Sequence, residues 1–529
     1  MENFTPQKTS LKKILLSLFV FGFIVIVAYV IYAAISIPAN IKKMAVTDTK
    51  LYYPPYPAVN TVGSNADVVK RGEYLTKAGD CIACHTNTAE REKSKPFAGG
   101  LAMPTPFGTL YTPNITPDKE TGIGSWTEEQ FANAMTHGIS PQGSYYYPAF
   151  PFMYFNRFTP EDIKAIKAYL DSIPAVSQPN RTNEMMFPFN WRFLQLGWRI
   201  LFFNAENTGP YKINAQKSEE WNRGAYLVDG AGHCAMCHSP SYNLLSESLP
   251  LGAPIRKYDL TGAKVQGYLA PNITKSNIGK ATDQEVMEVF TKDKLIGGGN
   301  VVGPMQEVNH DSLIYLTEQD LLAISRYLKT VESESPPKPK AGNGGPGKGT
   351  YETYCSGCHT MGAGGAPKLG DSTSWTPLLK TPITEIDHYA IYGIRGMPAK
   401  GTCLSCSDEE IKQAVDYMVG AVKGESSSNA HPAAPAPKKL TLADGKRLYT
   451  ENCAVCHNSG FKNAPKPGDV KAWEPIVANG FYDTYKEIKA GHKGHLPQGA
   501  CPTCSDEELI AALKYMMQSS APGKDYSLW

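Results

Sequence analysis

The sequence predicts an all-α protein in which an N-terminal transmembrane helix precedes four small helical domains. Three observations predict this architecture. Residues 14–37 form an apolar run without a charge. A five-residue pattern, Cys-x-x-Cys-His, occurs four times. Each copy lies between two stretches whose apolar residues recur at helical spacing. The 529 residues suit four domains of modest size.

The apolar run of 24 residues is long enough to cross a bilayer of about 30 Å. A cleaved signal peptide has a shorter apolar core and a small-residue cleavage site, for which residues 33–35 are a poor candidate. We therefore expect residues 1–45 to be an uncleaved membrane anchor, with a signal peptide as the alternative.

The repeated motif carries the chemistry. Two cysteines three residues apart can form thioethers with the vinyl groups of one porphyrin, and the adjacent histidine can then bind the iron. A single copy could instead be a zinc or redox Cys-x-x-Cys site. Four copies, each with its own helices, predict four covalently bound haem c groups. The predicted cofactor-binding residues are Cys81, Cys84, His85, Cys234, Cys237, His238, Cys355, Cys358, His359, Cys453, Cys456 and His457.

Haem attachment of this kind requires an extracytoplasmic location. We therefore expect a single-pass protein of the inner membrane with the bulk of the chain in the periplasm. The net charge of +2 argues against a nucleic-acid partner.

Residues 64–177 and 219–332 form the first repeated pair. Arg-Gly-x-Tyr-Leu occurs at residue 71 and again at 223, and Pro-Asn-Ile-Thr at 113 recurs at 271. The same motifs in the same order indicate a duplication. Asn-Ile-Thr is also a glycosylation sequon, but we interpret both copies as structure beside the haem.

Residues 343–423 and 440–529 form a second pair with a constant offset of 98 residues. Each copy carries a further Cys-x-x-Cys that lacks the histidine: Cys403 with Cys406, and Cys501 with Cys504. We expect two local disulfides, with a redox-active dithiol as the alternative. Residues 332–349 and 424–439 have the composition of linkers, which predicts that the third and fourth domains are tethered and can move relative to the first pair.

All four domains are expected to end in a capped helix. Thr159, Thr317, Ser407 and Ser505 each stand three residues before a carboxylate, as in a capping box. Together with the helix ahead of each motif, this gives two helices clasping one porphyrin. The predicted fold is that of class I cytochrome c.

The segment at 187–203 is dense in aromatic residues and contains Arg192 and Arg199, so it is not a second transmembrane span. It is expected to be interdomain core. A helix on the membrane surface or at a docking site for a partner is the alternative.

A second axial ligand is expected for each iron. Met305, in Gly-Pro-Met, and Met397, in Gly-Met-Pro, are the candidates for the second and third haems. Met153 is the candidate for the first haem, with Met135 and His137 as rivals.

The second ligand of the fourth haem is predicted from the constant offset of 98 residues. Adding 98 to Met397 gives His495, so we expect ligation by His457 and His495. His492 and Met516 are the alternatives.

Two resemblances follow from these motifs. Residues 64–332 resemble the cytochrome subunit of membrane-bound quinoprotein alcohol dehydrogenases and flavin-dependent gluconate-type dehydrogenases. The matching stretches are residues 96–100, 105–109, 147–151 and 303–305. Residues 343–423 and 441–520 resemble cytochrome c5 through Ala-Pro-Lys, the following tryptophan and the Cys-x-x-Cys-Ser-Asp-Glu-Glu ending. The dehydrogenase subunits usually carry a third domain of their own kind, whereas this chain ends in two c5-like domains.

An iron with both axial positions filled has no site for a substrate, which favours one-electron transfer over catalysis. We expect an electron carrier rather than an enzyme. Its partners would be periplasmic or membrane proteins: a quinol-oxidising complex or a dehydrogenase as donor, and a terminal oxidase or another acceptor. One alternative is the cytochrome subunit of a membrane-bound dehydrogenase complex. The other is a peroxidase-like haem enzyme with an open iron.

Overall fold

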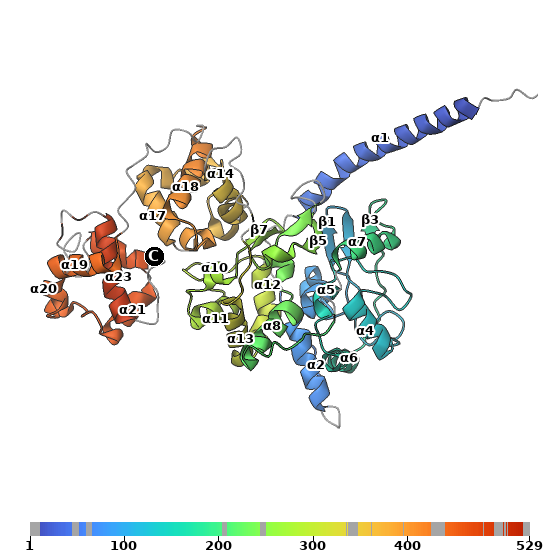
Figure 1. Ribbon diagram of the computed structural model, residues 1–529, viewed down its shortest axis with the longest axis horizontal. Helices are drawn as coiled ribbons and strands as arrows, with labels where there is room; N and C mark the ends of the chain where they lie inside the picture. The colour runs from blue at the N-terminus through green and yellow to red at the C-terminus, as the bar shows by residue number, and fades with distance from the viewer. Residues whose placement is uncertain are drawn as a thin grey trace, which may run out of the picture.

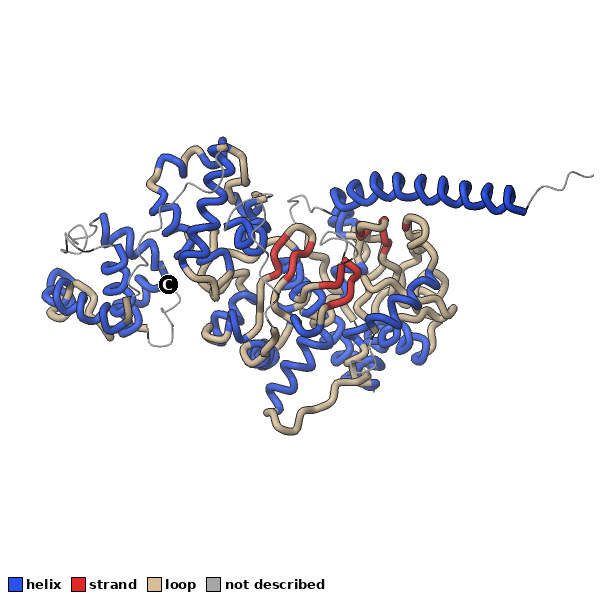
Figure 2. Tube along the Cα trace, turned by 45° about the horizontal axis from the view of Figure 1, so that its top comes forward, coloured by secondary structure: helices blue, strands red, loops and turns tan. Residues whose placement is uncertain are grey.

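The computed structural model of the protein is mostly helical (Figures 1 and 2). It describes residues 11–44, 52–59, 66–203, 209–243, 250–334, 336, 347–360, 362–394, 396–424, 440–479, 481–490, 501, 504 and 506–521. The first helix, α1 (Leu11–Met44), projects from the body. Within it, Phe19–Ile41 is the one described stretch that is long and apolar enough to cross a membrane.

We name four segments, each of which contains one Cys-x-x-Cys-His motif. The first holds α2 (Ala66–Ala78), α3 (Cys81–His85), β1 (Ala102–Thr105), β2 (Gly108–Tyr111), α4 (Glu128–His137), α5 (Phe152–Phe155) and α6 (Pro160–Ser172). A connector follows with β3 (Glu184–Met185), the 3-10 turn η2 (Arg192–Leu194) and α7 (Gln195–Phe202). The second holds α8 (Glu219–Tyr226), the π-turn η4 (Leu227–Ala231), α9 (Ala235–His238), β4 (Ser241–Asn243), β5 (Pro250–Pro254), β6 (Ala263–Val265), β7 (Tyr268–Ala270), α10 (Lys275–Ile278), α11 (Asp283–Thr291), α12 (Pro304–Asp311) and α13 (Glu318–Leu328).

The last two segments are shorter and contain no strand among their described residues. The third holds α14 (Gly347–Thr350), the π-turn η7 (Tyr351–Cys355), α15 (Ser356–His359), α16 (Ser372–Trp375), α17 (Ile383–Tyr392), the 3-10 turn η10 (Ala399–Thr402) and α18 (Asp408–Lys423). The fourth holds α19 (Leu442–Asn452), α20 (Ala454–His457), α21 (Val470–Asn479), α22 (Phe481–Ala490) and α23 (Asp506–Ser520).

In every segment the first helix crosses the last helix at a glycine. A Cβ added to Gly72 of α2 would lie 1.8 Å from the Ala165 carbonyl oxygen of α6. The same clash is found at Gly224, Gly347 and Gly445, each against a backbone carbonyl of the last helix of its own segment. Only a residue without a side chain allows two helices to approach so closely.

The helix starts predicted from the sequence are confirmed in three segments. The side chains of Thr159, Thr317 and Ser407 each accept a hydrogen bond from the backbone N–H three residues later, at the starts of α6, α13 and α18. The fourth predicted cap, Ser505, lies outside the described residues. These caps satisfy backbone donors that a helix leaves open at its first turn.

Short antiparallel hairpins interrupt the predicted all-helical pattern in the first half of the chain. β1 pairs with β2, β2 with β3, β4 with β5, and β6 with β7. These strands have two to five residues, and β1, β2 and β5 contain proline or glycine, so the strands are too short to show an alternating pattern. Figure 2 shows them as small red patches in a helical chain.

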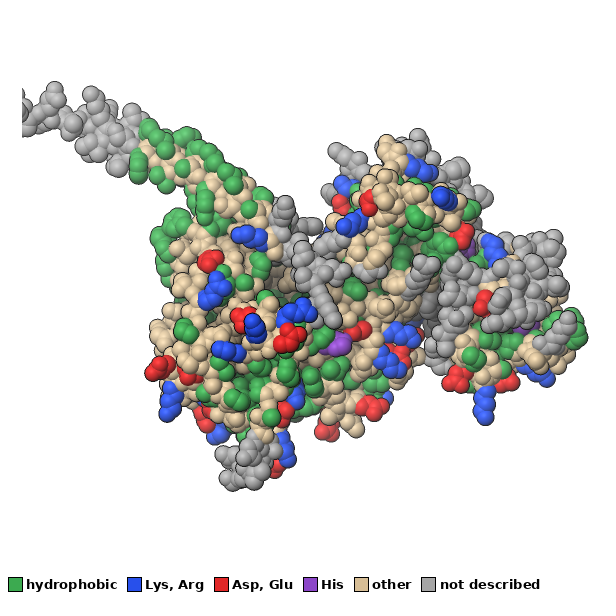
Figure 3. Space-filling model, turned by 180° about the vertical axis from the view of Figure 1, so that it is seen from behind, with side chains coloured by type: hydrophobic (Ala, Val, Ile, Leu, Met, Phe, Trp, Pro, Cys, Tyr) green, Lys and Arg blue, Asp and Glu red, His purple; other side chains and the backbone are tan. Residues whose placement is uncertain are grey.

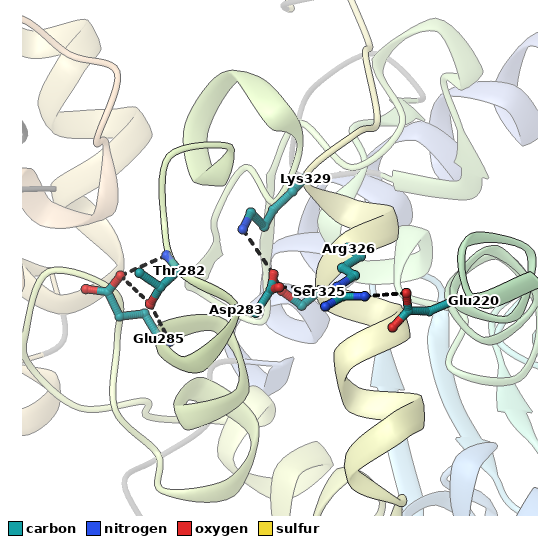
Figure 4. A network of polar contacts seen from close by, with 7 residues as sticks. All are labelled: Glu220, Thr282, Asp283, Glu285, Ser325, Arg326 and Lys329. Atoms are coloured by element: carbon teal, nitrogen blue, oxygen red, sulfur yellow. Dashed lines mark hydrogen bonds and ion pairs between the residues drawn. The ribbon is translucent and has the colours of Figure 1, made fainter. Parts of the chain in front are cut away.

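The first two segments share one apolar core, whereas the third and fourth each have their own. A network of charges on the second segment ties α8, α11 and α13 together (Figure 4). Asp283 accepts hydrogen bonds from Ser325 at 2.9 Å and from Lys329 at 3.0 Å, and Arg326 pairs with Glu220. Thr282 and Glu285 cap α11 beside it.

The third and fourth segments each contact the segment before them, and their expected movement relative to the first pair stays a prediction. α15 packs on β7 of the second segment, where a Cβ on Gly357 would lie 2.7 Å from the Leu269 nitrogen. Tyr392 of α17 stacks on Phe481 of the fourth segment, with ring centroids 6.0 Å apart. The four segments therefore contact one another in sequence order, and the last two lie on the side away from α1 (Figure 1).

The helix crossing predicts the effect of adding one methyl group. Gly72→Ala should destabilise the first segment by about 1–3 kcal/mol, because the Cβ overlaps a backbone atom that cannot move alone. Hydrogen exchange of α2 and α6 in the holoprotein should become faster. Gly197→Ala is the matched control, since Gly197 is also helical and a Cβ there meets nothing within 4 Å. Equal exchange in both variants would contradict the role assigned to the crossing.

Candidate functional site

All four Cys-x-x-Cys-His motifs end in the same hydrogen bond. The Nδ1 atom of each motif histidine lies against the carbonyl oxygen of a proline. The four pairs are His85 with Pro113 at 2.8 Å, His238 with Pro271 at 2.7 Å, His359 with Pro367 at 2.8 Å and His457 with Pro465 at 2.8 Å. A carbonyl can only accept, so Nδ1 carries the proton and donates it. Nε2 then carries the lone pair of each ring and is the atom that can bind a metal.

Burial favours the neutral form of three of these rings. It lowers the pKa of His85, His238 and His359, while the proline carbonyl acts in the opposite sense. A neutral imidazole with its Nδ1 proton engaged is the form that ligates iron. The four histidines thus have the tautomer that an axial ligand requires.

The repeated motifs of the sequence position these prolines. In the first two segments, the asparagine after the proline accepts hydrogen bonds from the threonine two residues on. For example, the Asn114 side chain accepts from the Thr116 N–H at 2.9 Å, and Asn272 accepts from Thr274 at 2.8 Å. Pro-Asn-Ile-Thr is therefore a turn that presents a carbonyl to the histidine, which agrees with its interpretation as structure beside the haem.

In the last two segments, different residues position the proline whose carbonyl meets the motif histidine. The indole N–H of Trp375 donates to the Lys368 carbonyl at 2.8 Å, and Trp473 donates to Lys466 at 2.9 Å. Each tryptophan thereby fixes the residue that follows the critical proline. The role of the four prolines was missed from the sequence, although each stands within a motif that the repeats singled out.

The eight motif cysteines are unpaired, and the other four form the predicted disulfides Cys403–Cys406 and Cys501–Cys504. Burial raises the pKa of the Cys81, Cys234 and Cys355 thiols to about 12. Redox-active dithiols have a lowered pKa instead. Among the described residues, no group of three or more His, Cys, Asp or Glu side chains is arranged to hold a metal ion.

The candidate second ligands lie in three kinds of surroundings. Met153 is on α5 and is buried in the core shared by the first two segments, while Met305 lies at the start of α12 and packs against that core. Met397 lies between α17 and η10, where its backbone pairs with Ile394. Of the rivals for the first haem, Met135 is buried on α4 and His137 is exposed at its end.

The candidates for the fourth haem are only partly described. His495 and His492 lie outside the described residues. Met516 lies on α23 and is buried in the core of the fourth segment, as Met418 on α18 is buried in the third. Both are helix-core residues, so Met516 has the surroundings of a packing residue.

Buried polar atoms provide a further test of whether the residues fit haem. The hydroxyl groups of Tyr154 and Tyr169 are buried and have no hydrogen-bond partner among the described residues. A buried hydroxyl without a partner is costly, and haem carries propionates that can accept from such donors. The motif thiols, the oriented histidines and these hydroxyls fit covalently bound haem.

A reciprocal contact joins the first two segments. Tyr74 of the first donates its hydroxyl proton to Asp320 of the second at 2.5 Å, and Tyr226 of the second donates to Asp162 of the first. Each aspartate is also paired within its own segment, Asp320 with Arg223 at 2.6 Å. Burial raises the pKa of Asp320, but the hydrogen bonds from Arg223 and Tyr74 outweigh it and hold that pKa below its usual value.

The first motif lies against the second segment. Burial raises the pKa of the Cys84 thiol, and the carboxylates of Asp80 and Glu307 raise it further. Glu307 belongs to α12 of the second segment, which packs on α3 of the first. The first motif is therefore at the boundary between the two segments.

The reciprocal contact predicts a specific loss of local stability. Tyr226→Phe removes one donor from a buried carboxylate, which should cost about 1–3 kcal/mol. Amide exchange at the start of α6 in the opposite segment should rise while the haem content stays constant. Tyr449→Phe is the control, since Tyr449 donates to Asn458 within the fourth segment. Faster exchange confined to α8 would contradict the contact.

Comparisons with known proteins agree with this geometry. A family model described as cytochrome c matches residues 69–174. A second, described as cytochrome c oxidase, cbb3-type, subunit III, matches residues 342–418 and 441–516. The chain therefore contains cytochrome c domains in both halves.

Three curated proteins show how much of the chain is shared. Identity is 41% over 323 residues with a nicotinate dehydrogenase subunit of Pseudomonas putida, covering 58% of this chain and 26% of that protein. It is 39% over 272 residues with the fructose dehydrogenase cytochrome subunit of Gluconobacter japonicus, covering 50% and 53%. It is 31% over 389 residues with the gluconate 2-dehydrogenase cytochrome c subunit of Pantoea cypripedii, covering 68% and 86%.

The chain thus spans about a quarter and about half the length of the first two relatives, but most of the third. A relative that is matched over most of its length, at 31% identity, establishes the family. The chain belongs to the family of cytochrome c subunits of alcohol, gluconate and fructose dehydrogenases.

Proposed function

We propose that the chain is a membrane-anchored, periplasmic electron-transfer subunit with four covalently bound haem c groups, one in each of four cytochrome c domains. Bound haem c would supply one-electron iron chemistry. The observation that carries the proposal is the hydrogen bond from each motif histidine to a proline carbonyl, which repeats in all four segments.

The residues of the chain have distinct parts in this function. The cysteine pairs hold the porphyrin, and the histidines present Nε2 to the iron. Met153, Met305 and Met397 are proposed as second ligands in the first three segments. The reciprocal contact of Tyr74 and Tyr226 would hold the first two haems at a fixed separation, and the packing of α15 on β7 would extend the series to the third.

A dehydrogenase is the proposed electron donor. The relatives named above are subunits of nicotinate, fructose and gluconate dehydrogenases, and they favour a dehydrogenase over a quinol-oxidising complex. The chain would be the cytochrome subunit of such a complex in the inner membrane and would pass electrons to a further acceptor.

The count of four haems is tested by the mass of the intact holoprotein. We expect the polypeptide mass plus four haem groups, because each pair of motif cysteines forms its own thioethers. The variant carrying both Cys453→Ala and Cys456→Ala should lose one haem and keep three. The control variant carrying Cys403→Ala and Cys406→Ala should keep all four, since these cysteines form a disulfide.

Carbon monoxide separates the proposed carrier from an enzyme with an open iron. The reduced holoprotein should show no fast spectral change with the gas, because both axial positions are filled. Rapid binding at one haem, or a mass corresponding to fewer than four haems, would contradict the proposal.

The fourth haem is proposed to be ligated by His457 and His495. An imidazole in place of a thioether stabilises ferric iron, so the potential of this haem should lie below that of the third. The oxidised protein should lack a methionine-to-iron charge-transfer band from this haem, and His495→Met should add one. An unchanged near-infrared spectrum in the variant would count against His495, and His492→Ala serves as its control.

A further inference from the structure

The connector between the first two segments turns its charged side chains toward the protein and its apolar side chains outward. The Arg192 guanidinium donates to the Tyr145 carbonyl at 2.7 Å, and Arg199 donates to the His137 carbonyl. Arg199 also lies 4.8 Å from the centre of the Phe203 ring. Both cations therefore face the first segment, where backbone carbonyls and aromatic rings satisfy them.

The opposite face of the connector is apolar and uncovered. Ile200 and Leu201 of α7 are 75% and 72% exposed, and Phe193 of η2 is 63% exposed. Trp191, Leu194 and Leu196 are also exposed. The expectation that this connector is interdomain core holds only for its inner residues, such as Trp198 and Phe203, which pack against the shared core.

This face adjoins the membrane anchor. The Tyr29 ring of α1 meets the Phe187 ring edge-on, with centroids 6.1 Å apart, and Phe187 meets Trp191 at 4.9 Å. The Asn40 side chain donates to the Pro106 carbonyl at 3.2 Å. In the second half of α1, the half-buried residues form one helical stripe against the body: Tyr29, Ala33, Ser36, Ile37, Asn40 and Ile41.

The length of α1 sets the depth of this contact. A hydrocarbon core of about 30 Å takes up about 20 residues. Counted from residue 14, the core would end near residue 33, so Tyr29 and the Phe187 ring beside it would lie below the headgroups.

We propose that the outer face of η2 and α7 lies in the bilayer interface, where it forms a second membrane contact beside α1. We define this membrane-contact face by Phe187, Trp191, Phe193, Leu194, Leu196, Ile200 and Leu201. Amphipathic segments with tryptophan, phenylalanine and leucine on one side lie in the interface in this way. Figure 3 shows apolar side chains on α1 and on the adjoining edge of the body.

Two ion pairs lie beside the membrane-contact face. Arg256 and Lys257 of the second segment line one cavity together with Leu201 and Phe202. Arg256 pairs with Asp259 and Lys257 with Glu334, so neither cation adds a net charge beside the apolar face. A protein partner is the other occupant to consider, but the depth of the Tyr29 contact favours lipid.

The test uses the purified full-length holoprotein in nanodiscs that contain a lipid-soluble carbene-generating photolabel. Labelled peptides are identified by mass spectrometry. We expect label in α1 and in residues 191–203. Val455 of α20 is the matched control, because it is 80% exposed and α20 lies on the opposite side of the molecule from α1 (Figure 1). Residues 191–203 should carry at least about tenfold more label than the control peptide, as expected for side chains within the acyl boundary.

Two results would overturn the proposal. The first is label in α1 with none above the control level in residues 191–203. The second is equal labelling of residues 191–203 and the control peptide. The proposed electron-transfer function does not depend on either result, since haem content and spectra are measured separately.

Discussion

The close crossing of the first and last helices is the constraint on which each segment depends. At Gly72, Gly224, Gly347 and Gly445, a single Cβ would overlap a backbone carbonyl of the opposite helix. Because the two helices touch through their backbones, they hold the two ends of the intervening chain together. That intervening chain carries the Cys-x-x-Cys-His motif and the proline that meets its histidine.

The two pairs of segments use different residues to present a proline carbonyl to the motif histidine. In the first pair, an asparagine and a threonine form the turn that presents the proline carbonyl. In the second pair, a tryptophan fixes the residue that follows the proline. The result in all four is a histidine whose Nδ1 faces a proline carbonyl and whose Nε2 carries the lone pair. This convergence within one chain indicates that the orientation of the histidine matters more than the means of achieving it.

Much of the fold and of the candidate site could be predicted from the sequence, because these features depend on local patterns of residues. The motif cysteines, the helix caps at Thr159 and Thr317 and the two disulfides are all set by residues within a few positions of one another. The hairpins were missed because strands of two to five residues carry too little pattern.

Contacts between segments could not be predicted for a different reason. A repeat shows that Tyr74 and Asp162 recur as Tyr226 and Asp320, but it does not show whether each tyrosine meets its own aspartate or that of the other segment. Composition likewise indicated linkers before the third and fourth segments but could not show that α15 packs on the second. The second ligand of the first haem remains a prediction, since Met153 is spaced differently from Met305.

The central claim is that the chain carries electrons from a dehydrogenase through its haems. The most direct measurement is the reduction of the haems after affinity purification of the tagged chain from membranes, with candidate alcohol, sugar, sugar-acid or nicotinate substrates added anaerobically. The account predicts that one substrate reduces haem as fully as dithionite does, in a preparation that contains a co-purified dehydrogenase subunit. Haems that dithionite reduces but no substrate does, in a preparation without such a subunit, would contradict it.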